Sequence, residues 1–176
     1  NGNVGTQGFG NHKHNDLLSF EYYDCSALLI VDPGSYVYTG DFEQRNAFRS
    51  TARHNTIVID NVEQNSFCPE YLFRMFEKAS PKHLDFSPTG NGVRYCGSHD
   101  GYLKQLEDGV THQRAFAHYF DTGRLEINDQ LTGTGEHTIV SSFHFAPEVT
   151  IEIIHDERSA ILSRDGHKWR LLWSDE

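Results

Sequence analysis

The sequence has few cysteines and no long apolar run. Its three cysteines, Cys25, Cys68 and Cys96, are too few and too irregularly spaced for a disulfide framework or a zinc ribbon. One disulfide bridge stays open, but we expect three buried thiols. The longest apolar run, residues 27–31, is far shorter than the roughly 18 residues that a membrane-spanning helix needs. The sequence therefore predicts no membrane span.

Positive charge is scarce as well. Lys and Arg total 15 against 25 Asp and Glu, which gives a formal net charge of −10 at pH 7. A protein that binds a nucleic-acid backbone needs clustered Lys and Arg to replace condensed counterions. Nucleic acid is therefore not an expected partner. An anionic substrate would also be repelled unless its binding cleft were locally basic.

The size of the chain limits it to one domain. Its 176 residues, 37% hydrophobic and 12% aromatic, are enough to fill one core and too few for two full domains. The chain opens Asn-Gly-Asn-Val-Gly, without Met or a charged-then-apolar leader, so we expect a piece of a longer protein. Residues 1–176 are predicted to form a single unit.

Helical periodicity is nearly absent, and short runs rich in Val, Ile, Tyr, Phe and Thr indicate an all-β domain. We expect about eleven strands, near residues 17–23, 27–31, 55–59, 73–77, 93–98, 112–120, 124–128, 137–145, 150–154, 159–162 and 169–173. Turn residues at 121–123, 133–135 and 164–166 predict hairpins. So many strands favour an antiparallel two-sheet β-sandwich, with a closed barrel as the second choice.

One segment, residues 41–53, departs from the strand pattern. Arg45, Arg49 and Arg53 are spaced four apart, with Phe42 and Phe48 between them, which predicts one short helix. The basic face of this helix either is solvated or contacts an anion.

The segment richest in chemistry is a His-x-His motif in a glycine-flanked loop, Gly-Asn-His-Lys-His-Asn-Asp at residues 10–16. Side chains at i and i+2 point to the same side of an extended backbone, so His12 and His14 can converge on one point. Two surface histidines in a loop are the alternative interpretation.

Two further candidates lie at the ends of expected strands. Asp32 follows the apolar run 27–31, and His54 directly precedes the run 55–59. With His14 they supply two imidazoles and a carboxylate, a set suited to Zn²⁺, with Mn²⁺ also possible and a fourth position left for water. Asp32 can instead start the Pro-Gly turn that follows it. Spacing alone does not establish that the three side chains converge.

Three blocks of sequence resemble the heparinase II/III family of polysaccharide lyases. In order they are Gly-Asn-His-Lys-His-Asn-Asp at 10–16 with Leu-Ser-Phe-Glu at 18–21, Val-Asp-Pro-Gly-Ser-Tyr at 31–36, and Phe-Arg-Ser-Thr-Ala-Arg-His-Asn-Thr at 48–56. Later segments are similar too: Gln-Arg at 113–114, Asp-Gln-Leu-Thr-Gly at 129–133 with Glu-His at 136–137, and Phe-His-Phe-Ala-Pro at 143–147. The resemblance covers roughly residues 8–147.

The resemblance implies a fold and an activity. Members of this family join an N-terminal α/α toroid to a C-terminal antiparallel β-sandwich and cleave acidic polysaccharides by β-elimination. Residues 1–176 resemble only the sandwich, so the toroid of the parent protein is the implied partner and the fragment alone is expected to be inactive. The family also implies a bacterial protein in the periplasm or outside the cell. The glycan stays open among glycosaminoglycan, alginate and exopolysaccharide types.

The resemblance also assigns roles to site residues. His14, Asp32 and His54 match the metal-binding positions, and His12 matches a histidine that faces the substrate. The metal, expected to be zinc, would be mainly structural and would hold the loop that carries His12. Tyr38, or Tyr36 near it, would be a second tyrosine in the cleft or a packing residue.

Two arginines, Arg49 and Arg53, are candidates for binding anionic sugar groups through their forked donors. The alternative is that they pair with nearby carboxylates, Asp16, Glu21 or Glu43.

Two other functions compete with a lyase. One is a non-catalytic, metal-stabilised carbohydrate-binding or structural domain in a cell-envelope or exopolysaccharide pathway. The other is a cupin-like metalloenzyme, whose His-x-His motif is followed three or four residues later by Glu. Here Asp16 follows His14 by two residues and Glu21 by seven, so the cupin pattern fails.

Overall fold

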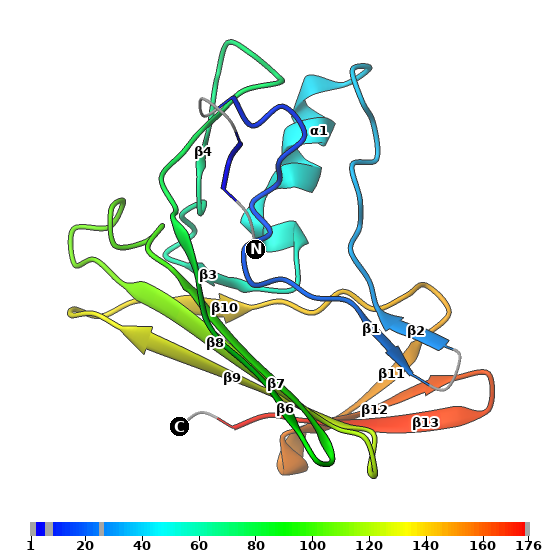
Figure 1. Cartoon of the computed structure of the whole chain (residues 1–176). Coiled ribbons are helices and arrows are strands. Elements are labelled where there is room, and N and C mark those ends of the chain that lie inside the picture. Colours follow the sequence, from blue (N-terminus) through cyan, green and yellow to red (C-terminus); the bar gives the residue numbers. More distant parts are fainter. Residues whose placement is uncertain (1–2, 6–8, 25–26, 175–176) are drawn as a thin grey trace.

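The computed structural model describes residues 3–5, 9–24 and 27–174. This part of the chain contains a single α-helix, two 3₁₀-helices and thirteen strands (Figure 1). The strands are β1 (Tyr22–Asp24), β2 (Ala27–Ile30), β3 (Ile57–Ile59), β4 (Ser66–Phe67), β5 (Met75–Phe76), β6 (Pro81–Thr89), β7 (Gly92–His99), β8 (Thr111–Tyr119), β9 (Arg124–Thr132), β10 (Ile139–Ser141), β11 (Thr150–Ile154), β12 (Ser159–Arg164) and β13 (His167–Leu172).

All the strand pairs are antiparallel, and the predicted all-β, sandwich-like class is confirmed. The largest sheet has the order β6-β7-β8-β9, and the next has the order β11-β12-β13. Three two-stranded ladders, β1-β2, β10-β3 and β4-β5, complete the fold, which is thus divided more finely than the two sheets expected. Figure 1 shows α1 and the N-terminal loops above the four-stranded sheet, with β11–β13 beside β1 and β2.

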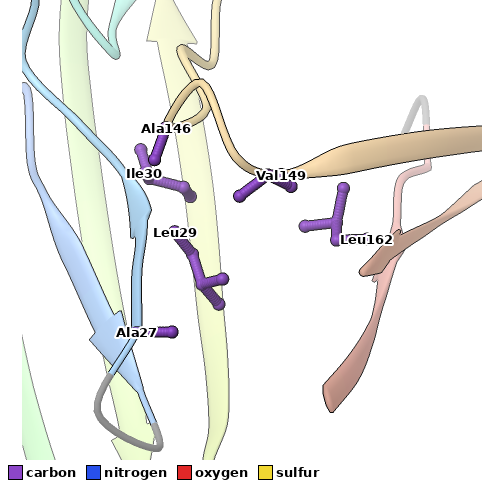
Figure 2. Close-up of a cluster of buried hydrophobic side chains, with 6 residues drawn as sticks. All are labelled: Ala27, Leu29, Ile30, Ala146, Val149 and Leu162. Carbon is purple, nitrogen blue, oxygen red and sulfur yellow. The ribbon is translucent and has the colours of Figure 1, made fainter. Parts of the chain in front are cut away.

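The main core lies between β2 and the C-terminal sheet. Its buried members are Ala27, Leu29, Ile30, Ala146, Val149 and Leu162 (Figure 2). A second cluster joins β3 to the large sheet through Ile57, Ile59, Tyr102 and Val110. The two clusters flank the segment between β2 and β3, and so fix the strand ends at which the candidate site residues lie.

The predicted short helix is confirmed as α1 (Phe42–Arg49), followed by the 3₁₀-helix η2 (Thr51–Arg53). Asp41 caps its N-terminus, because its Oδ1 accepts a hydrogen bond from the Gln44 N–H at 2.9 Å. Arg45 and Arg49 lie four residues apart and therefore share a face, which is buried. No helix in the described ranges is both long and apolar enough to span a bilayer.

Two strands were not predicted. β4 has only two residues, and β6 is an edge strand that begins at Pro81, contains Pro88 and is largely exposed. Proline is tolerated at a sheet edge because it need not donate to the ladder, but it hides the strand pattern in the sequence.

One predicted hairpin is wrong. Residues 121–123 join β8 to β9 and residues 164–166 join β12 to β13, as expected. Residues 133–135, however, connect β9 to β10, which pairs with β3 instead of β9. Local turn chemistry indicated the reversal but not the partner of the next strand. Of the cysteines, Cys68 is a buried free thiol and Cys96 a half-buried one, while Cys25 lies outside the described residues.

Candidate metal centre

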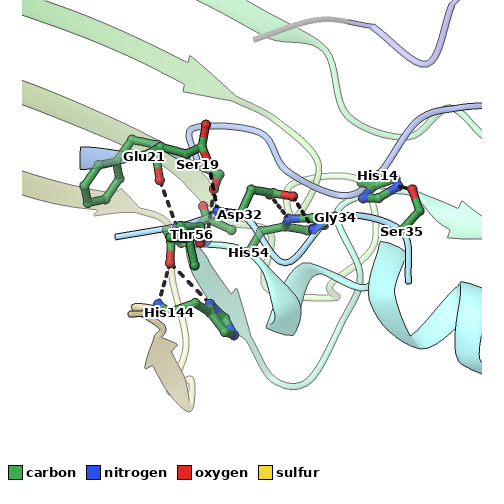
Figure 3. Close-up of polar contacts among 12 residues, drawn as sticks. His14, Ser19, Glu21, Asp32, Gly34, Ser35, His54, Thr56 and His144 are labelled. Carbon is green, nitrogen blue, oxygen red and sulfur yellow. Dashed lines mark hydrogen bonds and ion pairs between the residues drawn. The ribbon is translucent and has the colours of Figure 1, made fainter. Parts of the chain in front are cut away.

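His14, Asp32 and His54 come together at one point, as predicted. Each offers one ligand atom, and these atoms all lie within 4.8 Å of one another. His14 lies on the loop before β1, Asp32 follows β2, and His54 follows η2 (Figure 3). The fold therefore brings three residues that are distant in sequence to one site at the strand ends.

Hydrogen bonds already orient the three side chains. His54 Nδ1 lies 2.7 Å from Asp32 Oδ2, and Asp32 Oδ1 accepts from the Gly34 N–H at 2.8 Å. His14 Nε2 lies 3.3 Å from the Ser35 Oγ. The rings of His14 and His54 are 5.2 Å apart between centroids. The Pro-Gly turn after Asp32 thus serves both as a turn and as support for the site.

The atom that best tests for a metal is His54 Nε2. His54 is fully buried, and this nitrogen has no hydrogen-bond partner among the described residues. A buried polar atom without a partner is costly. The other ring nitrogen, Nδ1, faces the Asp32 carboxylate, so His54 can offer an ion either nitrogen. The donor set fits a divalent cation.

Electrostatics keep the donors in the protonation states that metal binding requires. Burial and then the neighbouring His54 lower the pKa of His14, which favours the neutral ring with a free lone pair. Burial acts to raise the pKa of Asp32, but hydrogen bonds from His54 and the Gly34 N–H outweigh it, and the pKa is lowered. Asp32 is therefore a carboxylate at neutral pH.

Helix α1 holds the loop that carries the His-x-His motif. Arg45 Nη2 donates to the Asn11 carbonyl at 3.3 Å, and Arg49 Nε donates to the Lys13 carbonyl at 2.9 Å. Arg49 Nη2 also donates to the Gly10 carbonyl at 3.3 Å. Gly10 has a φ of +55°, and a Cβ there would lie 2.5 Å from Val4 Cγ1, so this position needs glycine.

Arg49 is fully buried, which argues against its predicted contact with anionic sugars. Its guanidinium is occupied by the carbonyls of Lys13, Gly10 and Leu72 and by the Asn46 side chain. It forms no pair with the carboxylates considered as alternatives. Burial, and then the charge of Arg45, lower the pKa of Arg49 to about 10. The spacing predicted the helix but could not show which of its faces is buried.

Arg53 is exposed, and its Cζ lies 5.9 Å from the centroid of the Phe48 ring. Tyr36 stacks on the same Phe48, with ring centroids 5.1 Å apart. Tyr36 is 71% exposed and has a φ of +54°, a conformation that a non-glycine residue adopts at a cost. Tyr36 and Arg53 are thus exposed side chains that contact the half-buried Phe48, and each is next in sequence to a residue of the site, Ser35 and His54.

The predicted catalytic residues, His12 and Tyr38, are neighbours. Their rings stack with centroids 5.9 Å apart and an interplanar angle of 15°, and both side chains are exposed. Phe73 and Arg45 pack against Tyr38 at 5.0 Å and 4.9 Å from its ring centroid. The Tyr38 ring is therefore supported by one apolar contact, from Phe73, and one cationic contact, from Arg45.

His12 and His14 have different neighbours, so the geometric expectation that both converge on one point is wrong. The Lys13 N–H donates to the Gly10 carbonyl at 3.2 Å and closes a turn, so the backbone there is not extended. His12 is thereby left with Tyr38 and His14 with His54. This separation agrees with the two roles that the family resemblance implies.

Sequence reasoning missed the residues that support the site. Asn55 Nδ2 donates to the carbonyls of Phe20 and Val31 at 2.8 and 2.9 Å, and its Oδ1 accepts from the His144 N–H at 2.6 Å. Glu63 accepts from the Asn15 side chain at 2.8 Å and from the Thr51 N–H at 2.8 Å. Their partners are mostly backbone groups distant in sequence, which no spacing reveals.

Comparisons with known proteins bear on the family and the fold of the chain. The family described as "Heparinase II/III-like, C-terminal" matches residues 1–176. A heparin-sulfate lyase of Bacteroides stercoris is 28% identical over 131 residues, which cover 73% of this chain and 17% of that protein. The crystal structure of Heparinase III shares the fold, with a TM-score of 0.66, 21% identity and coverage of 90% of this chain and 22% of that one. This chain therefore spans about a fifth of either relative's length.

Proposed function

Because the chain belongs to the heparinase II/III-like C-terminal family, we propose that it is the β-sandwich part of a polysaccharide lyase that cleaves uronate-containing acidic glycans by β-elimination. The observation that carries this proposal is the convergence of His14, Asp32 and His54 beside the exposed pair His12 and Tyr38. The names of the relatives favour a heparin-type glycan over an alginate-type one. Such a polymeric substrate favours a periplasmic or extracellular location.

In this proposal His14, Asp32 and His54 hold one divalent ion, with Zn²⁺ preferred because the donors are two imidazoles and one carboxylate. When bound, the ion supplies positive charge and ties the His12 loop to two strand ends. The residues themselves contribute to the ordering, since Asp32 contacts His54 and Ser35 contacts His14. Fixing His12 in this way places it within the tolerance that catalysis needs.

The elimination removes the proton at C5 of the uronate, uses that electron pair to form the C4–C5 double bond, and releases the C4 glycosidic oxygen with its bonding pair. A base takes the C5 proton, an acid protonates the leaving oxygen, and positive groups stabilise the enolate-like charge on the carboxylate. We assign His12 to proton transfer at the reacting sugar. We assign Tyr38 to contact with the same sugar ring. Their exposed, stacked rings present a nitrogen and a phenol on one surface.

The remaining catalytic groups would come from an N-terminal α/α toroid of the parent protein, so we propose that the isolated chain is inactive. The toroid would also supply much of the positive wall for an anionic substrate, since this chain has a net charge of −10. Arg53, which is exposed near Tyr36 and Phe48, is the candidate in this chain for a direct contact with an anionic sugar group.

The test is a His12→Ala variant of the parent protein, assayed by the ultraviolet absorbance of the unsaturated uronate product on a panel of acidic glycans. We expect turnover to be lost while the metal content stays at the wild-type level, because His12 lies outside the triad. His155→Ala, which removes an exposed histidine far along the chain, is the matched control and should keep full activity. Wild-type turnover in His12→Ala would refute the assignment. Glycan binding without product in the wild-type parent protein would instead indicate the non-catalytic alternative.

A further inference from the structure

A buried arginine of the large sheet lies against the backbone of the candidate metal centre. Arg114, on β8, is fully buried, and its Nη1 donates to two carbonyl oxygens, those of Leu18 at 3.0 Å and Asn55 at 2.5 Å. Leu18 follows His14 by four residues, and Asn55 follows His54 by one. A single nitrogen therefore bridges the two chain segments that carry the histidine ligands.

Asn55 extends this bridge to the third ligand. Its side-chain Nδ2 donates to the carbonyl of Val31, the residue before Asp32, at 2.9 Å. Leu18 has a φ of +62°, so the chain there is held in a conformation that a leucine rarely adopts. Arg114 and Asn55 together thus hold the backbone four residues after His14, one residue before Asp32 and one residue after His54.

The orientation of Arg114 is set by a partly buried carboxylate, that of Asp129, whose side chain is 19% exposed. Asp129 on β9 accepts from Arg114 Nε at 2.6 Å and from Nη2 at 2.8 Å, a two-point contact that fixes the plane of the guanidinium. The carboxylate also neutralises the buried charge. Its pKa is lowered, since hydrogen bonds from His112 and Arg114 outweigh the effect of burial.

Two buried histidines complete this chain of contacts. The Gly101 N–H donates to His99 Nδ1 at 3.3 Å, so His99 carries its proton on Nε2, which lies 3.2 Å from His112 Nδ1. His112 in turn has its proton on Nε2, 2.7 Å from Asp129 Oδ1. Every ring nitrogen in the series has a partner, and the donors all point toward Asp129. The arrangement specifies one position for the carboxylate and hence for Arg114.

We propose that Arg114 is a positioning residue for the metal centre, because it sets the spacing between the segments that carry His14 and His54. Asp129, His112 and His99 in turn orient Arg114. The proposal rests on the metal centre of the proposed function. A lysine at this position keeps the charge but carries its three N–H donors on one nitrogen instead of on a rigid planar fork, so it cannot hold two carbonyls and both carboxylate oxygens together. The loss of preorganisation should appear as weaker metal binding.

The experiment measures metal affinity directly, without any assay of turnover. The full 176-residue chain is titrated with Co²⁺, followed by its visible absorption, and Zn²⁺ affinity is obtained by competition. We expect Arg114→Lys to weaken binding by about 10- to 100-fold, the range typical of groups that orient metal ligands, and to change the Co²⁺ spectrum. Both titrations are run well below the melting temperature of each variant.

Arg164→Lys is the matched control. Arg164 also bonds a main-chain carbonyl, that of Leu28 at 2.5 Å, and lies near carboxylates. It reaches only the one segment that leads to Asp32, however, so it does not join two ligand-bearing segments as Arg114 does. It should bind Co²⁺ with wild-type affinity and spectrum. Asp129→Asn is the second test variant if Arg114→Lys does not fold, and it should weaken binding because it leaves Arg114 without its anionic partner.

The possible outcomes distinguish the positioning role of Arg114 from the existence of the metal centre. Folded Arg114→Lys or Asp129→Asn chains with wild-type affinity and spectrum would overturn the positioning role alone. Equal weakening in Arg164→Lys would also overturn it, since the effect would then be general destabilisation. Failure of the wild-type chain to bind either ion would overturn the metal centre itself, and the positioning role with it.

Discussion

Helix α1 and strand β8 both place buried arginines against the backbone around the triad, but the two regions neutralise them differently. Arg45 and Arg49 on α1 bind main-chain carbonyls and one side-chain amide, and no carboxylate in the described part of the chain pairs with either. Arg114 on β8 binds both oxygens of Asp129. One region thus keeps its positive charge, and the other cancels it.

The difference suits the two regions to different tasks. The uncompensated charge of α1 lies next to Tyr38 and the His12 loop, where it makes a negatively charged chain locally favourable to an anionic ligand. The neutral network of β8 and β9 adds no such field. Instead it fixes the backbone, because Arg114 holds the carbonyl oxygens of Leu18 and Asn55 in the segments that carry His14 and His54.

The largest expected effect on stability comes from removing Asp129, the carboxylate that neutralises Arg114. Asp129→Ala leaves Arg114 buried without its anion, and removing one partner of a buried pair costs about 3–5 kcal/mol. Chemical denaturation should show this loss in the free energy of unfolding. Asp85→Ala removes an exposed carboxylate from β6, at the opposite edge of the same sheet, and should cost about 0.5 kcal/mol or less. A loss at Asp129 no larger than at Asp85 would remove the distinction between the two regions.

The second effect is a pH dependence of stability to which the buried His99, on β7, contributes. Burial, then His112, lower the pKa of His99 to about 3 from its ordinary 6.5, with Arg114 acting the same way and Asp100 opposing it. As the pH falls below 6.5 the unfolded chain binds a proton that folded His99 does not. The contribution of His99 to the free energy of unfolding is therefore fully present above this pH and is lost progressively down to about pH 3.

Between pH 7 and pH 5 this loss amounts to about 2 kcal/mol. His99→Gln should flatten the pH dependence of the free energy of unfolding by that amount. Arg49 on α1 contributes nothing in this window, because its pKa stays at about 10. An unchanged slope in His99→Gln would mean that His99 does not titrate in this way.

The smallest effect lies on the α1 side. Arg53→Gln in the parent protein removes an exposed cation beside Phe48 and should raise the KM for the acidic glycan by about two- to fivefold with kcat unchanged, since exposed ion contacts contribute about 0.2–1 kcal/mol. Arg94→Gln, an exposed arginine on β7, is the control and should leave KM unchanged. Equal KM values in the two variants would exclude Arg53 from the substrate site.

These regions also show what the sequence could and could not predict. The strand-end positions of Asp32 and His54 and the His-x-His motif were visible because each has a local signature. The all-β class and the short helix were predictable from periodicity. The burial of Arg49 was not, because which face of a helix is covered depends on the loop that folds over it. Asn55 and Arg114 were missed because their partners are carbonyls 24 to 96 residues away.

The central claim is most directly tested by the metal content of the chain, measured by elemental analysis after purification with added divalent metals. The structure predicts one ion per wild-type chain and none in a folded His54→Ala variant, because His54 supplies the buried nitrogen that has no other partner. A wild-type chain without stoichiometric metal, or a His54→Ala chain that retains it, would contradict the account.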